Sequence, residues 1–127
     1  MSRTIHLLHV EDDVMQHKVI QFHLTKLDGY LFEVTHAKNE QEALDAFDQQ
    51  KFDLVILDYY LDETDGRKCI QQFRTQNKTV PILVLSGVMQ TQLQEELIGL
   101  GANRFLTKEN LTKQNFINTV ISLLETE

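Results

Sequence analysis

Polar residues able to do chemistry follow short apolar runs at several points in this chain of 127 residues. Asp58 comes directly after Leu54–Leu57, where a strand buried on both faces would end. Carboxylates gathered at one place repel one another unless a hard divalent cation lies among them, and ligands that are all oxygen favour Mg²⁺. A nearby hydroxyl and ammonium would bind the oxygens of a phosphoryl group, toward which a carboxylate can act as a nucleophile. After three of the other runs come Glu11, Asp12 and Asp13, then Ser86, then Lys108, whereas Lys38 and Asn39 after a fourth run are typical of a loop and a helix cap.

Short apolar runs alternate with amphipathic stretches along the whole chain. This alternation predicts an α/β fold, with a mostly parallel sheet of five strands, helices on both faces and right-handed crossovers. Ligands of such sheets bind beyond the carboxyl ends of the strands, so the polar residues named above are expected to meet at one edge. The predicted strands are Ile5–Val10, Leu31–Ala37, Leu54–Leu57, Ile82–Leu85 and Arg104–Thr107.

Apolar residues at helical spacing lie between the predicted strands and are expected to face the core. In the first helix Met15, Val19 and Phe22 fall at i, i+4 and i+7. Before the second helix, Asn39 and Glu42 are spaced as a capping pair. The other apolar stripes are Ala43, Leu44 and Phe47; Cys69, Ile70 and Phe73; Leu93, Leu97 and Leu100; and Phe116, Ile117, Val120, Ile121 and Leu124.

Four segments, HVEDD, VILDYYLDETDG, ILVLSG and FLTK, resemble in order and spacing the receiver domain of two-component response regulators. The resemblance covers essentially the whole chain. It implies a flavodoxin-like doubly wound (βα)5 fold with a five-stranded parallel sheet, and a single receiver domain over residues 1–127 without an output domain. Such a domain is either a stand-alone regulator or a piece of a longer regulator or hybrid kinase.

The resemblance implies a phosphoacceptor role for Asp58, which would receive its phosphoryl group from a histidine kinase or a histidine phosphotransfer protein. Glu11 and Asp12 match the acidic pair that holds Mg²⁺ together with Asp58. Asp13 matches a third acid with a lesser role. The backbone carbonyl of Tyr60 matches the remaining protein ligand of the metal.

Three further residues match the parts that respond to the phosphoryl group. Ser86 resembles the hydroxyl that bonds it, Lys108 the lysine that pairs with it, and Phe105 the aromatic switch that turns inward on activation. The resemblance implies that the surface of the fourth helix, fifth strand and fifth helix then changes shape for a downstream protein. It also implies a monomer or a phosphorylation-dependent homodimer.

The chain departs from the family pattern after the third and fifth strands. Glu109 replaces a proline that usually follows the lysine at Lys108, often after a cis peptide. A cis bond before a residue other than proline costs about 2.5–4 kcal/mol, so this bond is expected to be trans. Asp62 replaces a second proline, and with Glu63 and Asp65 it is expected in the loop and at the start of the next helix.

Tyr60 and Val88 occupy the positions two residues past Asp58 and Ser86, where the family tunes hydrolysis. Neither side chain can position water as an amide or a carboxylate would. The phosphoryl group is therefore expected to be long-lived.

Charge and composition argue against some classes of binding partner and some locations in the cell. A formal net charge of −7, from 19 acidic and 12 basic residues, argues against direct binding to nucleic acid or to an anionic membrane. The single Cys69 suits a reducing compartment, and the chain has neither a signal-peptide pattern nor an apolar run of about 18 residues. A cytoplasmic protein without membrane insertion is expected, and an enzyme only in the sense that it catalyses its own phosphorylation and slow dephosphorylation.

Two other functions remain open. A Mg²⁺-dependent phosphatase with an aspartyl nucleophile would carry D-x-D, whereas Tyr60 stands two residues past Asp58. A degenerate receiver acting only as a protein-binding module would not need the complete set of motif residues.

The histidines give no metal-ligand spacing. His6 and His9 cannot share one face of a strand, which argues against a zinc site. His17, in the first helix, is expected on the surface, at the face where family members dock their phosphodonor.

Overall fold

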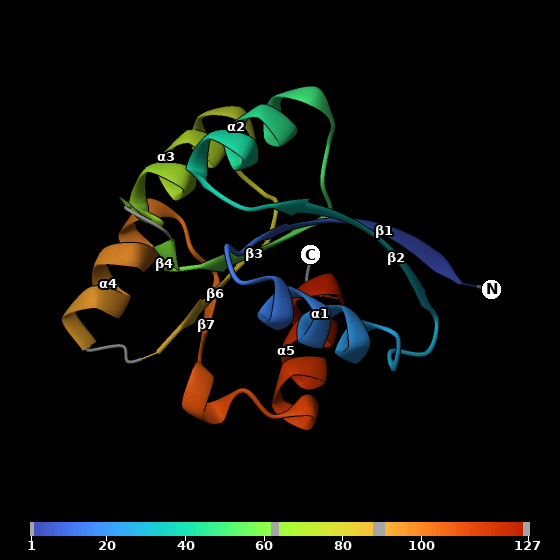
Figure 1. Ribbon diagram of the computed structural model, residues 1–127. Helices are drawn as coiled ribbons and strands as arrows, with labels where there is room; N and C mark the ends of the chain where they lie inside the picture. The colour runs from blue at the N-terminus through green and yellow to red at the C-terminus, as the bar shows by residue number, and fades with distance from the viewer. Residues whose placement is uncertain (1, 62–63, 88–90, 126–127) are drawn as a thin grey trace.

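The computed structural model describes residues 2–61, 64–87 and 91–125 (Figure 1). Within these ranges, five parallel strands form one sheet in the order β2-β1-β3-β6-β7, and a short antiparallel hairpin, β4–β5, follows β3. This confirms the predicted doubly wound, flavodoxin-like fold. The strands are β1 (Arg3–Val10), β2 (Tyr30–Ala37), β3 (Leu54–Asp58), β4 (Tyr60–Leu61), β5 (Thr64–Asp65), β6 (Ile82–Ser86) and β7 (Arg104–Thr107).

Helices cover both faces of the sheet (Figure 1). Apolar side chains of α1 and α5 pack on one face, and those of α2, α3 and α4 pack on the other. Every residue of β3 and β6 is buried, as expected for strands covered on both sides. The helices are α1 (Val14–Leu24), α2 (Glu40–Gln49), α3 (Arg67–Gln76), α4 (Thr91–Leu100) and α5 (Lys113–Glu125), and a 3₁₀ turn, η1, spans Lys108–Asn110.

Four of the five predicted helical stripes face the core. The α3 stripe is completely buried, and burial raises the pKa of the Cys69 thiol to about 12, which makes it an inert core residue. The predicted cap of α2 is confirmed, because Asn39 Oδ1 accepts the backbone N–H of Glu42 at 2.8 Å.

The predicted inner face of α1 is wrong. Met15 and Phe22 are 67% and 58% exposed, and the buried residues of the helix are His17, Ile20 and Leu24. The helix carries apolar residues on two sides, so spacing alone did not decide which side turns inward. The side that turns inward packs Ile20 and Leu24 into the core and brings His17 against the sheet.

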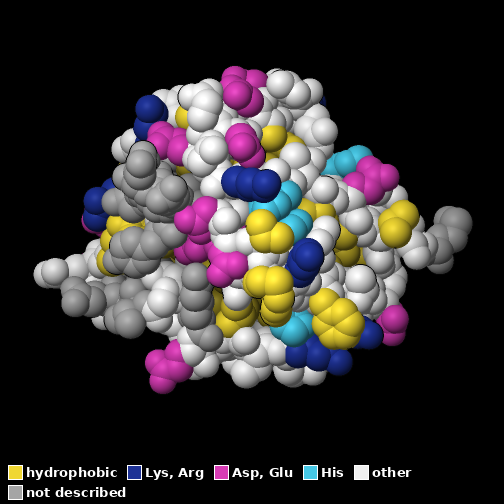
Figure 2. Space-filling model, in the orientation of Figure 1, with side chains coloured by type: hydrophobic (Ala, Val, Ile, Leu, Met, Phe, Trp, Pro, Cys, Tyr) yellow, Lys and Arg dark blue, Asp and Glu magenta, His cyan; other side chains and the backbone are white. Residues whose placement is uncertain are grey.

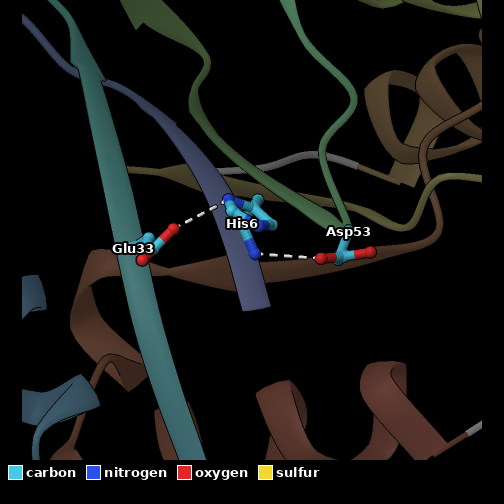
Figure 3. Close-up of polar contacts among 3 residues, drawn as sticks. All are labelled: His6, Glu33 and Asp53. Carbon is cyan, nitrogen blue, oxygen red and sulfur yellow. Dashed lines mark hydrogen bonds and ion pairs between the residues drawn. The ribbon is translucent and has the colours of Figure 1, made fainter. Parts of the chain in front are cut away.

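At the amino end of the sheet, Asp53 connects β1 to the start of β3 (Figure 3). Its Oδ2 accepts the backbone N–H of His6 at 2.9 Å, and its own N–H donates to the His6 carbonyl at 2.7 Å. His6 also forms an exposed ion pair with Glu33 on β2, at 3.2 Å from Nδ1 to Oε2. These contacts fix the register from which β1 and β3 run in parallel to the opposite edge.

Candidate functional site

Three carboxylates meet at the carboxyl edge of the sheet, where β1 and β3 lie side by side. The register pairs Val10 with Leu57, so the next residues, Glu11 and Asp58, lie at the same level at the ends of β1 and β3. One carboxylate oxygen of Glu11, one of Asp12 and one of Asp58 all lie within 4.8 Å of one another. We call these three side chains the acidic cluster.

The acidic cluster lies at the switch in strand order. In the sheet, β2 lies on one side of β1 and β3 lies on the other. This is where open α/β sheets bind their ligands. Glu11 and Asp58 are 0% and 3% exposed, whereas Asp12 is exposed. Two buried carboxylates beside an open one fit a divalent cation that keeps part of its water shell.

The donor set fits Mg²⁺ better than a softer metal, because it offers oxygen only. Within the described residues, no other group of three His, Cys, Asp or Glu side chains brings ligand atoms this close. The neighbouring Asp13 has a structural role, since its Oδ1 accepts the backbone N–H groups of Met15 at 2.9 Å and Gln16 at 3.3 Å, capping α1. Three of the four predicted metal residues, Glu11, Asp12 and Asp58, therefore lie together, and the Asp13 side chain is not one of the group.

The other predicted residues lie along the same edge. Ser86 is completely buried at the end of β6 and pairs in register with Thr107, after which Lys108 begins η1. The Lys108 side chain and Val88 lie outside the described part of the structure. The backbone of Tyr60 begins β4, two residues past Asp58. The sheet register thus supports convergence for Ser86 and for the start of η1.

Phe105 is half-buried on β7 and packs against the core beneath α2, α3 and α4. In register it lies beside Val84, two residues before Ser86. This is the position expected of an aromatic residue beside the β6 end, and it also serves as an ordinary core contact.

Of the predictions for the segments after β3 and β7, one is confirmed and one is wrong. None of the peptide bonds in the described ranges is cis, so the predicted trans bond between Lys108 and Glu109 is confirmed. The prediction for Asp65 is wrong, because it lies in β5 and pairs with Tyr60, and α3 begins only at Arg67. Asp62 and Glu63 lie outside the described residues.

A cluster of three histidines adjoins the acidic cluster, and sequence analysis did not predict it. His9 and His36 are neighbours in register on β1 and β2, and His17 reaches them from α1. His9 Nδ1 lies 2.7 Å from His17 Nδ1, and the His17 and His36 rings stack with centroids 3.6 Å apart and planes 6° apart. His36 Nε2 lies 2.6 Å from the backbone carbonyl oxygen of Glu11.

His17 is only 8% exposed, so the prediction that it lies on the surface is wrong. Burial, followed by the charges of His17 and His36, lowers the pKa of His9 to about 3. Burial, followed by the charge of His36, also lowers the pKa of His17. His9 and His17 are therefore neutral at pH 7. The sequence held one sign of the histidine cluster: His9 and His36 each stand one residue before the end of a predicted strand, so neighbouring parallel strands could place them side by side.

None of the helices in the described part of the chain combines the length and apolar character needed to cross a membrane.

The sequence matches the family model described as the response regulator receiver domain over residues 7–121. The transcriptional regulatory protein MalR of Bacillus subtilis is 29% identical over 104 residues, which is 82% of this chain but 44% of MalR. The chain thus spans less than half the length of that relative. Two solved structures share the fold, with sequence identities of 23% and 22%.

The first of these is the chemotaxis protein CheY4 of Vibrio cholerae, with a TM-score of 0.86 over 96% of this chain and 100% of that one. The second is the receiver domain of the sensor histidine kinase PA1611 from Pseudomonas aeruginosa, with a TM-score of 0.83 over 98% and 100%. The PA1611 structure holds a magnesium ion coordinated in its active site cleft.

Proposed function

The chain belongs to the family of response regulator receiver domains, the signalling modules of two-component systems, and from this premise we propose that Asp58 is its phosphoacceptor. The observation that carries the proposal is the position of the Asp58 carboxylate. It is buried at the end of a central strand, and its oxygen lies within 4.8 Å of oxygens from Glu11 and Asp12.

The donor is a phosphohistidine on a histidine kinase or a histidine phosphotransfer protein. A carboxylate oxygen of Asp58 attacks phosphorus, and the P–N bond breaks as the O–P bond forms. The donor imidazole is protonated on its other ring nitrogen, so it takes the P–N electron pair and leaves as the neutral ring. The products are an acyl phosphate on Asp58 and an unmodified histidine on the donor. Mg²⁺ held by Glu11, Asp12, Asp58 and the Tyr60 carbonyl would neutralise charge on the transferring oxygens.

The new group drives the signal. Phosphorylation replaces one negative charge by about two and adds acceptor oxygens, which Ser86 and Lys108 would approach. Ser86 is buried beside β7, so movement of its segment changes the space beside Phe105. Rotation of Phe105 would reshape the surface of α4, β7 and α5, through which a downstream protein is engaged.

The outer side of α1 supplies a docking surface for the phosphodonor. Val14, Met15, Val19 and Phe22 are 45%, 67%, 42% and 58% exposed, on the helix that begins directly after the acidic cluster. Figure 2 shows apolar side chains over α1 with basic side chains among them, and Lys26 lies 4.6 Å from the Phe22 ring centroid. An apolar strip with a basic border fits a donor helix that is itself amphipathic and acidic.

Beryllofluoride, a stable mimic of the phosphoryl group, tests the function directly. With Mg²⁺ present, we expect saturable binding and amide chemical-shift changes that extend from Asp58 through Ser86 to Phe105. Beryllofluoride without Mg²⁺ is the control and is expected to leave the spectrum unchanged.

The two alternatives predict other results in the same experiment. A degenerate receiver that only binds proteins would show no shift with beryllofluoride and Mg²⁺. A phosphatase would turn over a small phosphate ester such as p-nitrophenyl phosphate, which a receiver would not hydrolyse catalytically. The first result would overturn the assignment of Asp58 as phosphoacceptor, and the second would overturn the receiver function.

The aspartyl phosphate is expected to decay slowly. Tyr60 and Val88 stand at the two positions that tune hydrolysis in the family, and neither offers an amide or a carboxylate to orient the attacking water. We expect Tyr60→Glu together with Val88→Asn to shorten the lifetime by about 100-fold, the lower end of the range for positioned general acid–base groups. Loss of the label from purified phosphoprotein in Mg²⁺ buffer measures it, and decay of the wild type within seconds would contradict the expectation.

A further inference from the structure

The histidine cluster, formed by His9, His17 and His36, holds the backbone that carries the acidic cluster. A carbonyl oxygen only accepts, so the contact of 2.6 Å between His36 Nε2 and the Glu11 carbonyl places a proton on Nε2. The Glu11 N–H in turn donates to the Ala37 carbonyl at 2.9 Å. Both polar groups of the Glu11 backbone are therefore held by the end of β2, a strand that contributes no member of the acidic cluster.

The direction of the His36 ring is itself fixed. It lies flat against the His17 ring at 3.6 Å, and His17 is hydrogen-bonded to His9 on β1 at 2.7 Å. His9 Nε2 is buried and has no hydrogen-bond partner among the described residues. An unsatisfied acceptor is tolerated better than an unsatisfied N–H, so we assign the shared proton to His9 Nδ1, which donates to His17.

The geometry of the three rings fits a role in holding the Glu11 backbone better than it fits a second metal site. Parallel rings in face-to-face contact direct the lone pairs of their nitrogens side by side, and not toward one common point. The hydrogen bond from His36 instead ends on the backbone of a proposed metal ligand. Groups in that position orient ligands, and their loss typically lowers metal affinity by about 10–100-fold.

We propose that His36, oriented by His17, is a positioning residue that holds the Glu11–Asp12 segment in its metal-binding geometry and so sets the Mg²⁺ affinity of the acidic cluster. This inference rests on the proposed function, because it assumes that the acidic cluster binds Mg²⁺. It differs from that function in depending on β2 and α1, which contribute no member of the acidic cluster.

Two substitutions separate the hydrogen bond from the packing. His36→Phe keeps a ring to stack on His17 but removes the donor, and His36→Gln keeps an N–H near the position of Nε2 without the ring. We expect H36F to raise the Mg²⁺ dissociation constant about tenfold or more. H36Q is expected to restore it to within about threefold of the wild type, because the donor is what the Glu11 carbonyl requires.

The measurement is a Mg²⁺ titration followed by the amide resonances of Glu11, Asp12 and Tyr59, with no phosphoryl donor present. His6→Phe is the matched control, since His6 also lies on the sheet but pairs with Glu33 near the opposite edge. It should leave the dissociation constant unchanged. Circular dichroism establishes that each variant is folded. If H36F does not fold, His36→Met replaces it, because methionine has the length of glutamine without the donor.

The outcomes distinguish this inference from the proposed function. Weak Mg²⁺ binding in H36F with recovery in H36Q supports the positioning role. Equal binding by wild type, H36F and H36Q overturns that role and leaves the function of Asp58 intact. Equal weakening in H36F and H36Q also overturns it, because the ring and not its N–H would then be required. A wild type that does not bind Mg²⁺ overturns both.

Discussion

Replacing Asp58 with asparagine is expected to abolish phosphoryl transfer from a phosphohistidine donor, with labelling reduced at least about 100-fold. The amide retains the size of the side chain but lacks the anionic oxygen that attacks phosphorus. The reaction is followed by intact mass or by transfer of labelled phosphate, with Mg²⁺ in excess.

Asp53→Asn provides the matched control. It removes one carboxylate charge at the other end of the same strand, and the amide oxygen can still accept the His6 N–H that Asp53 accepts at 2.9 Å. Labelling of this variant should match the wild type within about twofold, since most surface substitutions change little. If Asp58→Asn were labelled as efficiently as Asp53→Asn, the site would have to be sought elsewhere.

Phe73→Ala is expected to cost about 3–5 kcal/mol of unfolding free energy, the range for large buried aromatic residues. Phe73 is a completely buried residue of α3, and its ring centroid lies 4.4 Å from that of Phe47 on α2. Removing it leaves a cavity in the core beneath both helices. Urea unfolding at 25 °C measures the loss.

Phe22→Ala tests the unexpected orientation of α1 in the same assay. The same side chain is removed, but Phe22 is 58% exposed, so the cost should be below about 0.5 kcal/mol. A loss for Phe22→Ala as large as that for Phe73→Ala would mean that α1 packs in solution with its other side inward.

The strands could be predicted from apolar runs within short segments, and the arrangement of the sheet could be predicted from the order of strands and helices along the chain. Runs such as Leu54–Leu57 and Ile82–Leu85 are apolar throughout, which only strands covered on both faces require. Their alternation with helical stripes then leaves few arrangements. The α1 orientation could not be predicted, because two apolar sides compete. The contacts of the inward side, such as those of His17 with His9 and His36, join residues on different elements.

The same distinction holds for the candidate site. Glu11, Asp12 and Asp58 were predicted because they lie at or just after the ends of predicted strands, and a parallel register brings such residues to one edge. The histidine cluster depends on the register of β1 with β2 and on the rotation of α1, neither of which leaves a periodic signal. The β4–β5 hairpin pairs only two residues on each side, too few for a recognisable alternation.

The strand order also has a consequence for synthesis of the chain. Residues up to Asp58 complete three adjacent strands, with β1 between β2 and β3, before β6 has been made. Until β6 pairs with it, the outer edge of β3 offers unpaired backbone groups along the apolar sequence LVIL. A nascent chain that stalls before Ile82 is therefore expected to aggregate readily and to bind chaperones. In a chain that extends past Ser86, β6 can pair with the outer edge of β3 and cover it.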